Sequence, residues 1–412
     1  GAQSMRVVLV SVLACLTESF AATGYIPLAP FIVRTEAVGW CFTLQGLAQF
    51  ATILYVGPLS DRVGSHVLLY RSLILNAVSL AFTVGSTALI CQLLGRLLQG
   101  IAGSACFMTS VALVIENFQE PERAQHIGTV IGACMVGALL GAPMTSWAYA
   151  LADQAPSRIA CAFLPSVVLL LAATFATSRL KLAAPMASKE KLLESSTSGN
   201  HGQTPFGVYR VVGRQAALIV AMIMVTCGAM VGLQCAGVLE LHGIGVTPAT
   251  LGVALIPNSL AQALISPLAG KLAATPLRRR RVLLSSLWFL AVSLVPVACM
   301  PWVNVAGVVT SMVASSVAMA LVDAPSISLM TELATSEGCS SGEAITASEL
   351  SVTMASALGP CLGSLGRDAL GFQGLCLAIA AAAGVLIALC AATLTEGAGY
   401  QSSSEAKPKQ DA

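Results

Sequence analysis

Four ionisable side chains lie deep inside long apolar segments of this chain: Glu18, Arg96, Asp323 and Glu349. A charge at the centre of a membrane-spanning helix costs about 2.5–3.5 kcal/mol on insertion scales, so such residues face a partner helix or a water-filled cavity. Their position alone makes them candidates for a functional role. The alternative is a buried, paired charge that only holds helices together, and it applies above all to Arg96, a single cation among acids.

Carboxylates in such positions can exchange a proton for a cationic substrate. A dry cavity favours the protonated acid, whereas a bound cation or an approaching arginine favours the carboxylate. One pH unit across a membrane is worth about 1.4 kcal/mol per proton, and a membrane potential adds about 2.3 kcal/mol per charge per 100 mV. The three acids therefore predict a proton-coupled step, in which protonation releases the cation on the acidic side of the membrane.

The composition indicates a membrane protein. Hydrophobic residues make up 56% of the 412 residues and charged residues only 10%, whereas a soluble domain carries about 25% charged residues. We therefore expect a polytopic protein that has the lipid bilayer as its solvent. The sequence has no basic patch with interleaved aromatic residues, which argues against nucleic-acid binding.

Catalytic and metal-binding patterns are missing from the sequence. The cysteines stand singly in apolar runs, which predicts neither a metal site nor a disulfide framework. There is no nucleophile–base pair and no phosphate-binding glycine loop. We therefore expect neither an enzyme nor a bound cofactor, and no feature indicates an obligate protein partner.

Twelve apolar segments are long enough to cross a bilayer, which needs about 20 mostly apolar residues. The first contains Glu18 near its middle and ends near Pro27 and Pro30, where a helix can bend or stop. The expected helices cover residues 7–32, 39–59, 67–84, 89–115, 127–149, 159–177, 216–239, 248–268, 282–300, 303–329, 344–365 and 375–394. The sequence thus predicts an all-α membrane protein with twelve transmembrane helices in two pseudo-symmetric six-helix bundles.

A polar segment separates the two sets of six helices. The expected parts are an N-terminal bundle over residues 1–180, a cytoplasmic linker over 181–214, a C-terminal bundle over 215–395 and a disordered cytoplasmic tail over 396–412. The turn after the second helix resembles the turn after the eighth, and Pro143 in the fifth helix has a counterpart in Pro360 in the eleventh. Two related halves around a site at the bilayer midplane are typical of a transporter.

Lysine and arginine residues predict the orientation. In a twelve-helix arrangement most of them, including the cluster 278–281, fall on one side, and only Arg34, Arg158 and Arg367 fall on the other. Cytoplasmic loops carry the excess of positive charge, so we expect both termini in the cytoplasm. The cluster is interpreted as an inside anchor, with a lipid or regulatory site as the alternative. The sequence does not distinguish a vesicle membrane from the plasma membrane.

Other charged residues lie at helix ends. Asp61 and Arg62 follow the second helix, and we expect them to latch one half against the other on the cytoplasmic side; a solvated turn is the alternative. Glu116 is interpreted as a boundary residue at the end of the fourth helix. A short acidic loop between the tenth and eleventh helices is expected to carry Glu332, Glu337 and Glu343.

Three motifs resemble those of the major facilitator superfamily. Residues 57–64 (GPLSDRVG) resemble its loop motif, residues 95–100 (GRLLQG) its helix-4 motif, and residues 137–143 (GALLGAP) its antiporter motif. The resemblance covers nearly the whole chain and implies the fold of that superfamily. It also implies conformational roles for Gly57, Asp61, Arg62, Gly64, Arg96, Gln99, Gly100, Gly137, Gly141, Pro143, Gly359 and Pro360.

Within that superfamily the chain looks most like the vesicular amine transporters and the related drug:proton antiporters. Glu18 and the two prolines after it are similar to the family's first helix. Residues 321–326 (LVDAPS) are similar to its Val-Asp-Ser-Ser segment, and Glu349, ten residues ahead of a Gly-Pro pair, is similar to its helix-11 acid. The resemblance implies that Glu18 contacts the cationic substrate and that Glu18, Asp323 and Glu349 take part in proton coupling.

Several positions depart from the amine transporters. Glu18 and Glu349 stand where the family has aspartate, which keeps the charge and lengthens the reach. The family's helix-2 lysine, its helix-7 acid and two aromatic pocket residues are replaced here by Gln45, Gln234, Gln262 and Ser356. These four, with Glu18 and Asp323, are the expected substrate-binding residues. Aromatic faces hold cations well, so their loss favours a polyamine or another organic cation over aromatic monoamines and acetylcholine.

These features predict a secondary active transporter that exchanges protons for a small organic cation by alternating access. Two alternatives stay open. One is a facilitator or exporter of a neutral or anionic metabolite, in which Arg96 binds the substrate and the acids are structural. The other is a transport-inactive receptor or scaffold, in which the polar linker and the acidic loop bind a partner.

Overall fold

The computed structural model describes residues 2–119, 122–152, 155–180, 213–273, 275–337 and 341–404. This part of the chain is helical and contains no strand. Eleven of its segments are long and apolar enough to cross a membrane. The predicted all-α membrane fold is therefore confirmed. Nearly all of the predicted linker lies outside the described residues.

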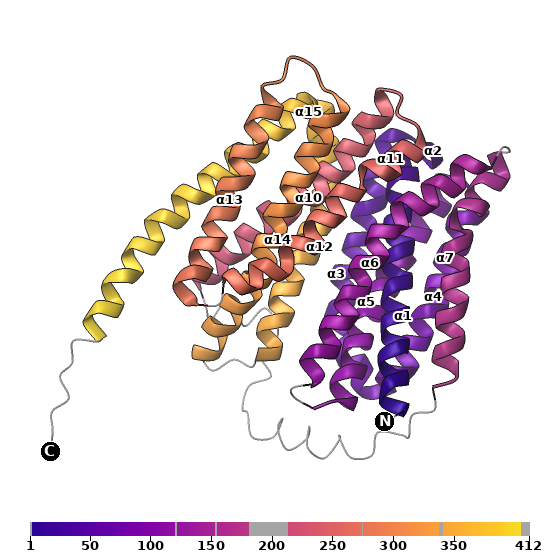
Figure 1. Cartoon of the computed structure of the whole chain (residues 1–412), viewed down its shortest axis with the longest axis horizontal. Coiled ribbons are helices and arrows are strands. Elements are labelled where there is room, and N and C mark those ends of the chain that lie inside the picture. The colour runs from indigo at the N-terminus through magenta and orange to yellow at the C-terminus, as the bar shows by residue number, and fades with distance from the viewer. Residues whose placement is uncertain are drawn as a thin grey trace.

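The helices form two bundles, which Figure 1 shows side by side in indigo to magenta and in orange to yellow. The first bundle contains α1 (Ala2–Tyr25), η1 (Ile26–Leu28), α2 (Ala29–Ile32), α3 (Thr35–Val63), α4 (Ser65–Gly85), α5 (Leu89–Asn117), α6 (Glu122–Leu151) and α7 (Ala155–Ser178). The second contains α10 (Arg214–Gly243), α11 (Pro248–Ala254), α12 (Ile256–Leu272), α13 (Pro276–Ala298), α14 (Val305–Ser336) and α15 (Ser341–Ser404). Most of the buried apolar side chains of each bundle belong to one large cluster.

Prolines divide two of the predicted helices. The first ends as α1 at Tyr25 and continues as η1 and α2, which begin with Pro27 and Pro30 near their first positions, as predicted. The predicted helix over 248–268 is instead two helices, because α11 ends at Ala254 and α12 starts with Pro257 in its first turn. A proline has no N–H to continue a helix and is well accommodated at the start of a new one.

The predicted eleventh and twelfth helices are joined in α15. Its apolar part, Thr346–Cys390, has 45 residues and would be about 68 Å long as one helix, far more than a bilayer core of about 30 Å. Gly371 divides it with φ 72° and ψ 167°, a conformation that glycine adopts readily. The second piece continues to Ser404, past the predicted start of a disordered tail at residue 396, since no proline interrupts this segment.

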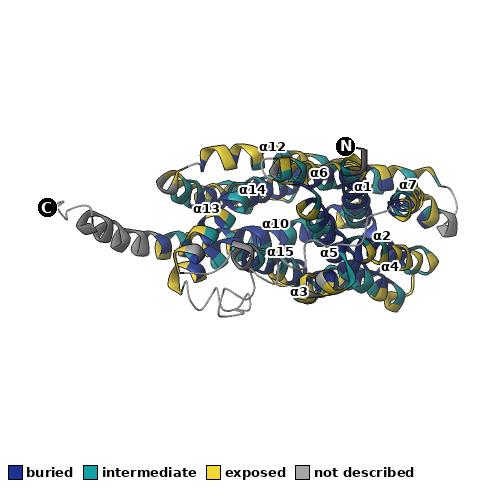
Figure 2. Cartoon of the chain, turned by 90° about the horizontal axis from the view of Figure 1, so that it is seen from below, coloured by how far each residue is buried: buried dark blue, intermediate teal, exposed yellow. Residues whose placement is uncertain are grey.

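The outer surface of the bundles is apolar. Figure 2 shows exposed residues along the outward face of α12 and buried residues along the inner helices α10 and α15. Leu260, Leu264 and Leu268 on α12 are among the large exposed hydrophobic residues. A bilayer requires such a surface because it offers no hydrogen bonds to polar groups. The chain is an integral, multi-pass membrane protein.

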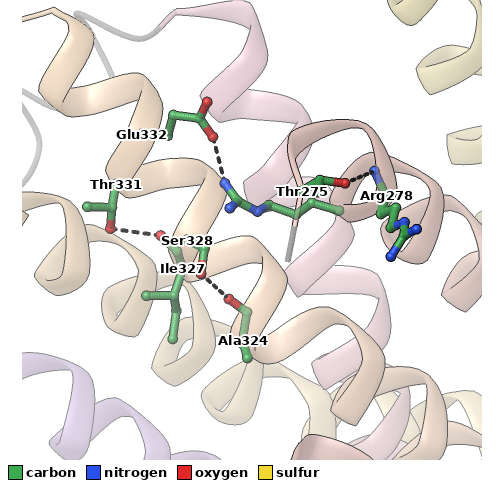
Figure 3. Close-up of polar contacts among 8 residues, drawn as sticks. Thr275, Arg278, Ala324, Ile327, Ser328, Thr331 and Glu332 are labelled. Carbon is green, nitrogen blue, oxygen red and sulfur yellow. Dashed lines mark hydrogen bonds and ion pairs between the residues drawn. The ribbon is translucent and has the colours of Figure 1, made fainter. Parts of the chain in front are cut away.

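Glu332 lies in α14 and not in the predicted acidic loop, and Glu343 belongs to α15. α14 continues to Ser336 because no proline or glycine follows Pro325 in it. The Glu332 carboxylate accepts a hydrogen bond from Nη1 of Arg279 at 2.6 Å, which joins the end of α14 to the first turns of α13. Figure 3 shows Glu332 directed towards α13. Nearby, the backbone N–H of Arg278 donates a hydrogen bond to Thr275 Oγ1, which caps the start of α13.

We expect loss of this ion pair to have a small effect on stability. The side chains of Arg279 and Glu332 are 15% and 50% exposed, and exposed pairs contribute about 0.2–1 kcal/mol. Glu332→Gln should lower the midpoint of thermal unfolding in detergent by no more than about 3 °C. Exchange of the charges, Arg279→Glu with Glu332→Arg, should restore most of the loss. A decrease beyond about 10 °C for Glu332→Gln would contradict this prediction.

Candidate functional site

The Glu18 carboxylate lies between α1 and α5. The side chain is half-buried, and a Cβ atom added at Gly103 of α5 would collide with its Oε1. Glycine at position 103 thus makes room for the acid. Ser19 Oγ donates a hydrogen bond to Oε2 at 3.5 Å, and the described residues supply no other. The carboxylate is therefore available to a proton or a cation.

Arg96 is fully enclosed in the same bundle, with 1% of its surface exposed. Its guanidinium lies 3.9 Å from the centroid of the Tyr25 ring, and Nη1 donates a hydrogen bond to Gln45 Oε1 at 3.5 Å. The side chains of Arg96 and Glu18 are both described and form no ion pair, although they are close enough for their charges to interact. Gly100, one turn after Arg96, lies against the backbone oxygen of Gln45, which brings α5 close to α3.

Sequence reasoning missed Tyr25. The side chain has 0% exposure, and its ring packs edge-on against Phe42 with the centroids 5.8 Å apart. Tyr25 follows Glu18 by seven residues, which is two helical turns, so the two share a face of α1. This spacing is a signal that the sequence contains.

Three predicted residues lie close to one thiol in the second bundle. Asp323 on α14 and Glu349 on α15 are half-buried and close enough for their charges to interact with each other and with Cys227 on α10. Cys227 Sγ lies 3.5 Å from Ser356 Oγ. The sequence interpretation treated the cysteines as packing residues and so missed Cys227. The two acids form a second group in which a proton could be held.

Other predicted residues are less well connected. Gln234 and Gln262 are half-buried, and neither makes a hydrogen bond to the described part of the chain. Gln99 is 1% exposed, and its Oε1 has no hydrogen-bond partner among the described residues. The structure therefore does not join the first two to either charged group.

The glycines of the antiporter motif bring α6 against α1. A Cβ atom added at Gly137 or Gly141 would collide with backbone oxygens of α1. Pro143 follows within α6. Close backbone contact of this kind is typical of glycines spaced by four in membrane helices. It fixes the position of α1 and therefore of Glu18.

Gly359 of α15 contacts two glycines of α10 that the sequence interpretation did not single out. A Cβ atom at Gly359 would lie 2.9 Å from Gly228 O, and one at Gly232 would lie 2.9 Å from Gly359 O. Gly363, one turn later, lies against the backbone of Gly232. Pro360 is enclosed in the same stretch of α15. The helices that carry Glu349 and Cys227 thus touch through their backbones.

The predicted polar turn over residues 57–64 is mostly helical, because α3 continues to Val63 and the chain turns only at Gly64. Gly64 is the only residue between α3 and α4, and its φ of 91° favours glycine. Gly57 and Arg62 are exposed. The Asp61 side chain lies outside the described residues, so its predicted role as a latch stays a prediction.

Glu116 has a structural contact beyond the boundary role predicted for it. Ser65, at the start of α4, donates a hydrogen bond to Glu116 Oε1 at 2.5 Å, and Ser65 Oγ is also 2.8 Å from Ser60 Oγ. These contacts join the ends of α3, α4 and α5 beside the loop motif.

The two bundles touch at the end of the molecule opposite the N-terminus, where Figure 1 places α2 and α11. Gly39 and Gly46 of α3 lie against α15, and Gly252 of α11 lies against α6; a Cβ atom at any of the three would collide with the facing helix. The ring of Phe31 in α2 packs edge-on against the ring of His242 in α10, with centroids 4.6 Å apart. These contacts join the bundles at that end.

Two bundles of membrane-spanning helices that bury acids and an arginine define a polytopic membrane transporter. The family model of the Major Facilitator Superfamily matches residues 7–237 and 236–411. The chain belongs to this superfamily.

Several transporters are similar to parts of the chain. The chromaffin granule amine transporter of Homo sapiens is 27% identical over 128 residues, which cover 31% of this chain and 24% of that protein. The multidrug resistance protein MdtL of Shewanella oneidensis is 28% identical over 93 residues, 23% of each chain. The matched segment thus spans less than a third of each relative.

The fold extends over the whole chain in a solved structure. The crystal structure of the nucleoside transporter NupG matches with a TM-score of 0.67, covering 96% of this chain and 99% of that one at 12% identity. Identity this low shows a common fold alone.

Proposed function

We propose that this transporter exchanges protons for a small organic cation. The observation that supports this most directly is the Glu18 carboxylate, which is half-buried in α1 and receives one long hydrogen bond and no ion pair from the described residues. An acid kept in this state within a membrane bundle can take a proton or a cation, but not both at once. The relatives named as amine and multidrug transporters support the cationic substrate.

Asp323 and Glu349 are the proposed proton sites of the second bundle. Their charges interact, so protonation of either acid relieves the repulsion between the two carboxylates. Proton uptake at this pair and at Glu18 would displace the cation towards the acidic compartment. Each bundle would then contribute an acid to one exchange cycle.

The orientation of the cycle is also a proposal. If the termini are cytoplasmic, as the arginine and lysine residues predict, the bundle contacts lie at the side away from the cytoplasm. The cation would then enter from the cytoplasm in this conformation, and the Asp61–Arg62 turn would contact the other bundle in the opposite one.

A polyamine is the proposed substrate class. Gln262 and Ser356 stand where the amine transporters have aromatic pocket residues, and the amide oxygens of Gln234 and Gln262 can accept hydrogen bonds from primary ammonium groups. Binding of an anionic metabolite by Arg96 has less support, because the guanidinium is covered by Tyr25 and is 1% exposed.

Uptake into proteoliposomes with an acidic lumen tests this function. We expect the wild-type protein to accumulate spermidine, to prefer it to serotonin and a lipophilic organic cation, and to lose accumulation when a protonophore is added. Liposomes without protein are the control. Uptake that is indifferent to the protonophore would overturn the antiport mechanism, and preference for serotonin would overturn the substrate class.

A further inference from the structure

Two contacts, each between one residue of α1 and one residue of α5, join these helices near Glu18. Glu18 lies against Gly103, and Tyr25 lies against Arg96. On both helices the two residues are seven positions apart, about 10 Å along the axis. Arg96 therefore lies about two helical turns from the level of Glu18, although the two charges interact.

The surroundings of Arg96 leave three buried polar groups unused. Arg96 Nε, Gln99 Oε1 and the Tyr25 hydroxyl have no hydrogen-bond partner among the described residues, although these side chains are at most 1% exposed. Buried polar groups are nearly always hydrogen-bonded. Gln99 lies on α5 between the levels of Arg96 and Gly103, so its free oxygen is on the route from Tyr25 to Glu18. The arrangement indicates a second position for the guanidinium, nearer to the acid.

We propose that Tyr25 is a positioning residue that holds Arg96 away from Glu18 while Glu18 carries a proton or a cation. This inference rests on the proposed function of Glu18. The aromatic face attracts the guanidinium and competes for it with the carboxylate. When Glu18 is empty and ionised, Arg96 leaves the ring and neutralises it; when Glu18 is occupied, Arg96 returns to the ring. The proposed role belongs to the aromatic face of Tyr25 and does not require its hydroxyl.

Few other titratable groups in the described part of the chain lie near Arg96 and Glu18. Those that face Arg96 are Tyr25 and Glu18 on α1 and Cys41 on α3. Cys134 on α6 is the further titratable group whose charge would interact with Glu18. Cys41→Ser and Cys134→Ser are therefore the control variants. They show whether a pH-dependent effect comes from titration of either thiol and not from the position of Arg96.

The test compares Tyr25→Phe, which keeps the aromatic face, with Tyr25→Leu, which removes it. Tyr25→Met is the substitute if the leucine variant does not fold.

Arg96 that is released from the ring competes with the cation at Glu18. We expect Tyr25→Leu to raise the KM for the transported cation about 2- to 30-fold, the range for one lost cation–π contact, and to move the pH of half-maximal transport to more acidic values. Tyr25→Phe should change neither. In an Arg96→Gln background, Tyr25→Leu should add no further effect.

A second measurement does not need a substrate. The thermal stability of the purified protein in detergent is recorded against pH, and the step removed by Glu18→Gln is assigned to Glu18. We expect Tyr25→Leu to move this step to more acidic pH only when Arg96 is present. A step that does not move, or the absence of a step due to Glu18, overturns the role of Tyr25. Failure of wild-type protein to transport any of the cations would instead overturn the proposed function, and the pH step would still decide about Tyr25.

Discussion

Glu18→Gln is expected to lower proton-coupled uptake of the cation about 30-fold or more. The amide keeps the shape and the hydrogen bond from Ser19 but can neither neutralise a cation nor take a proton. Loss of one partner of a buried charge pair costs about 2–5 kcal/mol, which is the source of this estimate. The measurement is the initial rate of uptake into proteoliposomes with an acidic lumen.

Two variants make this result specific. Glu36→Gln removes an acid from the exposed first turn of α3 and should leave uptake unchanged. Glu18→Asp keeps the charge and should retain a measurable part of the activity. Wild-type uptake by the Glu18→Gln protein would remove Glu18 from the mechanism and turn attention to Arg96 and to neutral or anionic substrates.

Gly363→Leu is expected to prevent correct packing of the second bundle, and Gly363→Ala to destabilise it by about 1–3 kcal/mol or more. A Cβ atom at this position would lie 2.6 Å from Cα of Gly232. The obstacle is backbone of α10, so α10 and α15 must separate to admit any side chain. The midpoint of thermal unfolding and the elution profile in detergent measure the loss.

Gly384→Ala, in the second piece of α15, is the matched control. Nothing lies within 4 Å of a Cβ atom added there, and alanine is favoured over glycine in a helix by about 0.8–1 kcal/mol. This variant should be at least as stable as the wild-type protein. If Gly363→Ala were equally harmless, the close contact of α10 with α15 would not contribute to stability.

The membrane-spanning helices could be predicted from the sequence because their lengths are set by the thickness of the bilayer. The hydropathy of segments such as 89–115 and 127–149 predicts α5 and α6 to within several residues at each end. The break at Pro257 and the extension of α14 through Glu332 were missed, since both depend on where a helix is allowed to continue and not on how apolar it is.

Contacts between helices could be predicted only in part. Glu18, Arg96 and Glu349 stand out because a charge is costly in lipid. Their partners Tyr25 and Cys227 do not, since apolar and aromatic residues occur on all faces of a membrane helix and periodicity gives little information on its rotation. The contact of Gly359 with Gly228 likewise requires knowing which two helices meet and at what level.

The glycines at the junction of the bundles have a consequence for the energetics of the transport cycle. At Gly46 the main chain of α3 meets the main chain of α15, whereas Gly39 and Gly252 lie against the side chains of Ser364 and Ser146. A carrier of this kind must separate these close contacts to open this end, and a ligand with a modest preference for one conformation shifts the population when the two conformations lie within a few kcal/mol of each other. Larger residues at these three positions are therefore expected to oppose closure of this end of the molecule, independently of what the transporter carries.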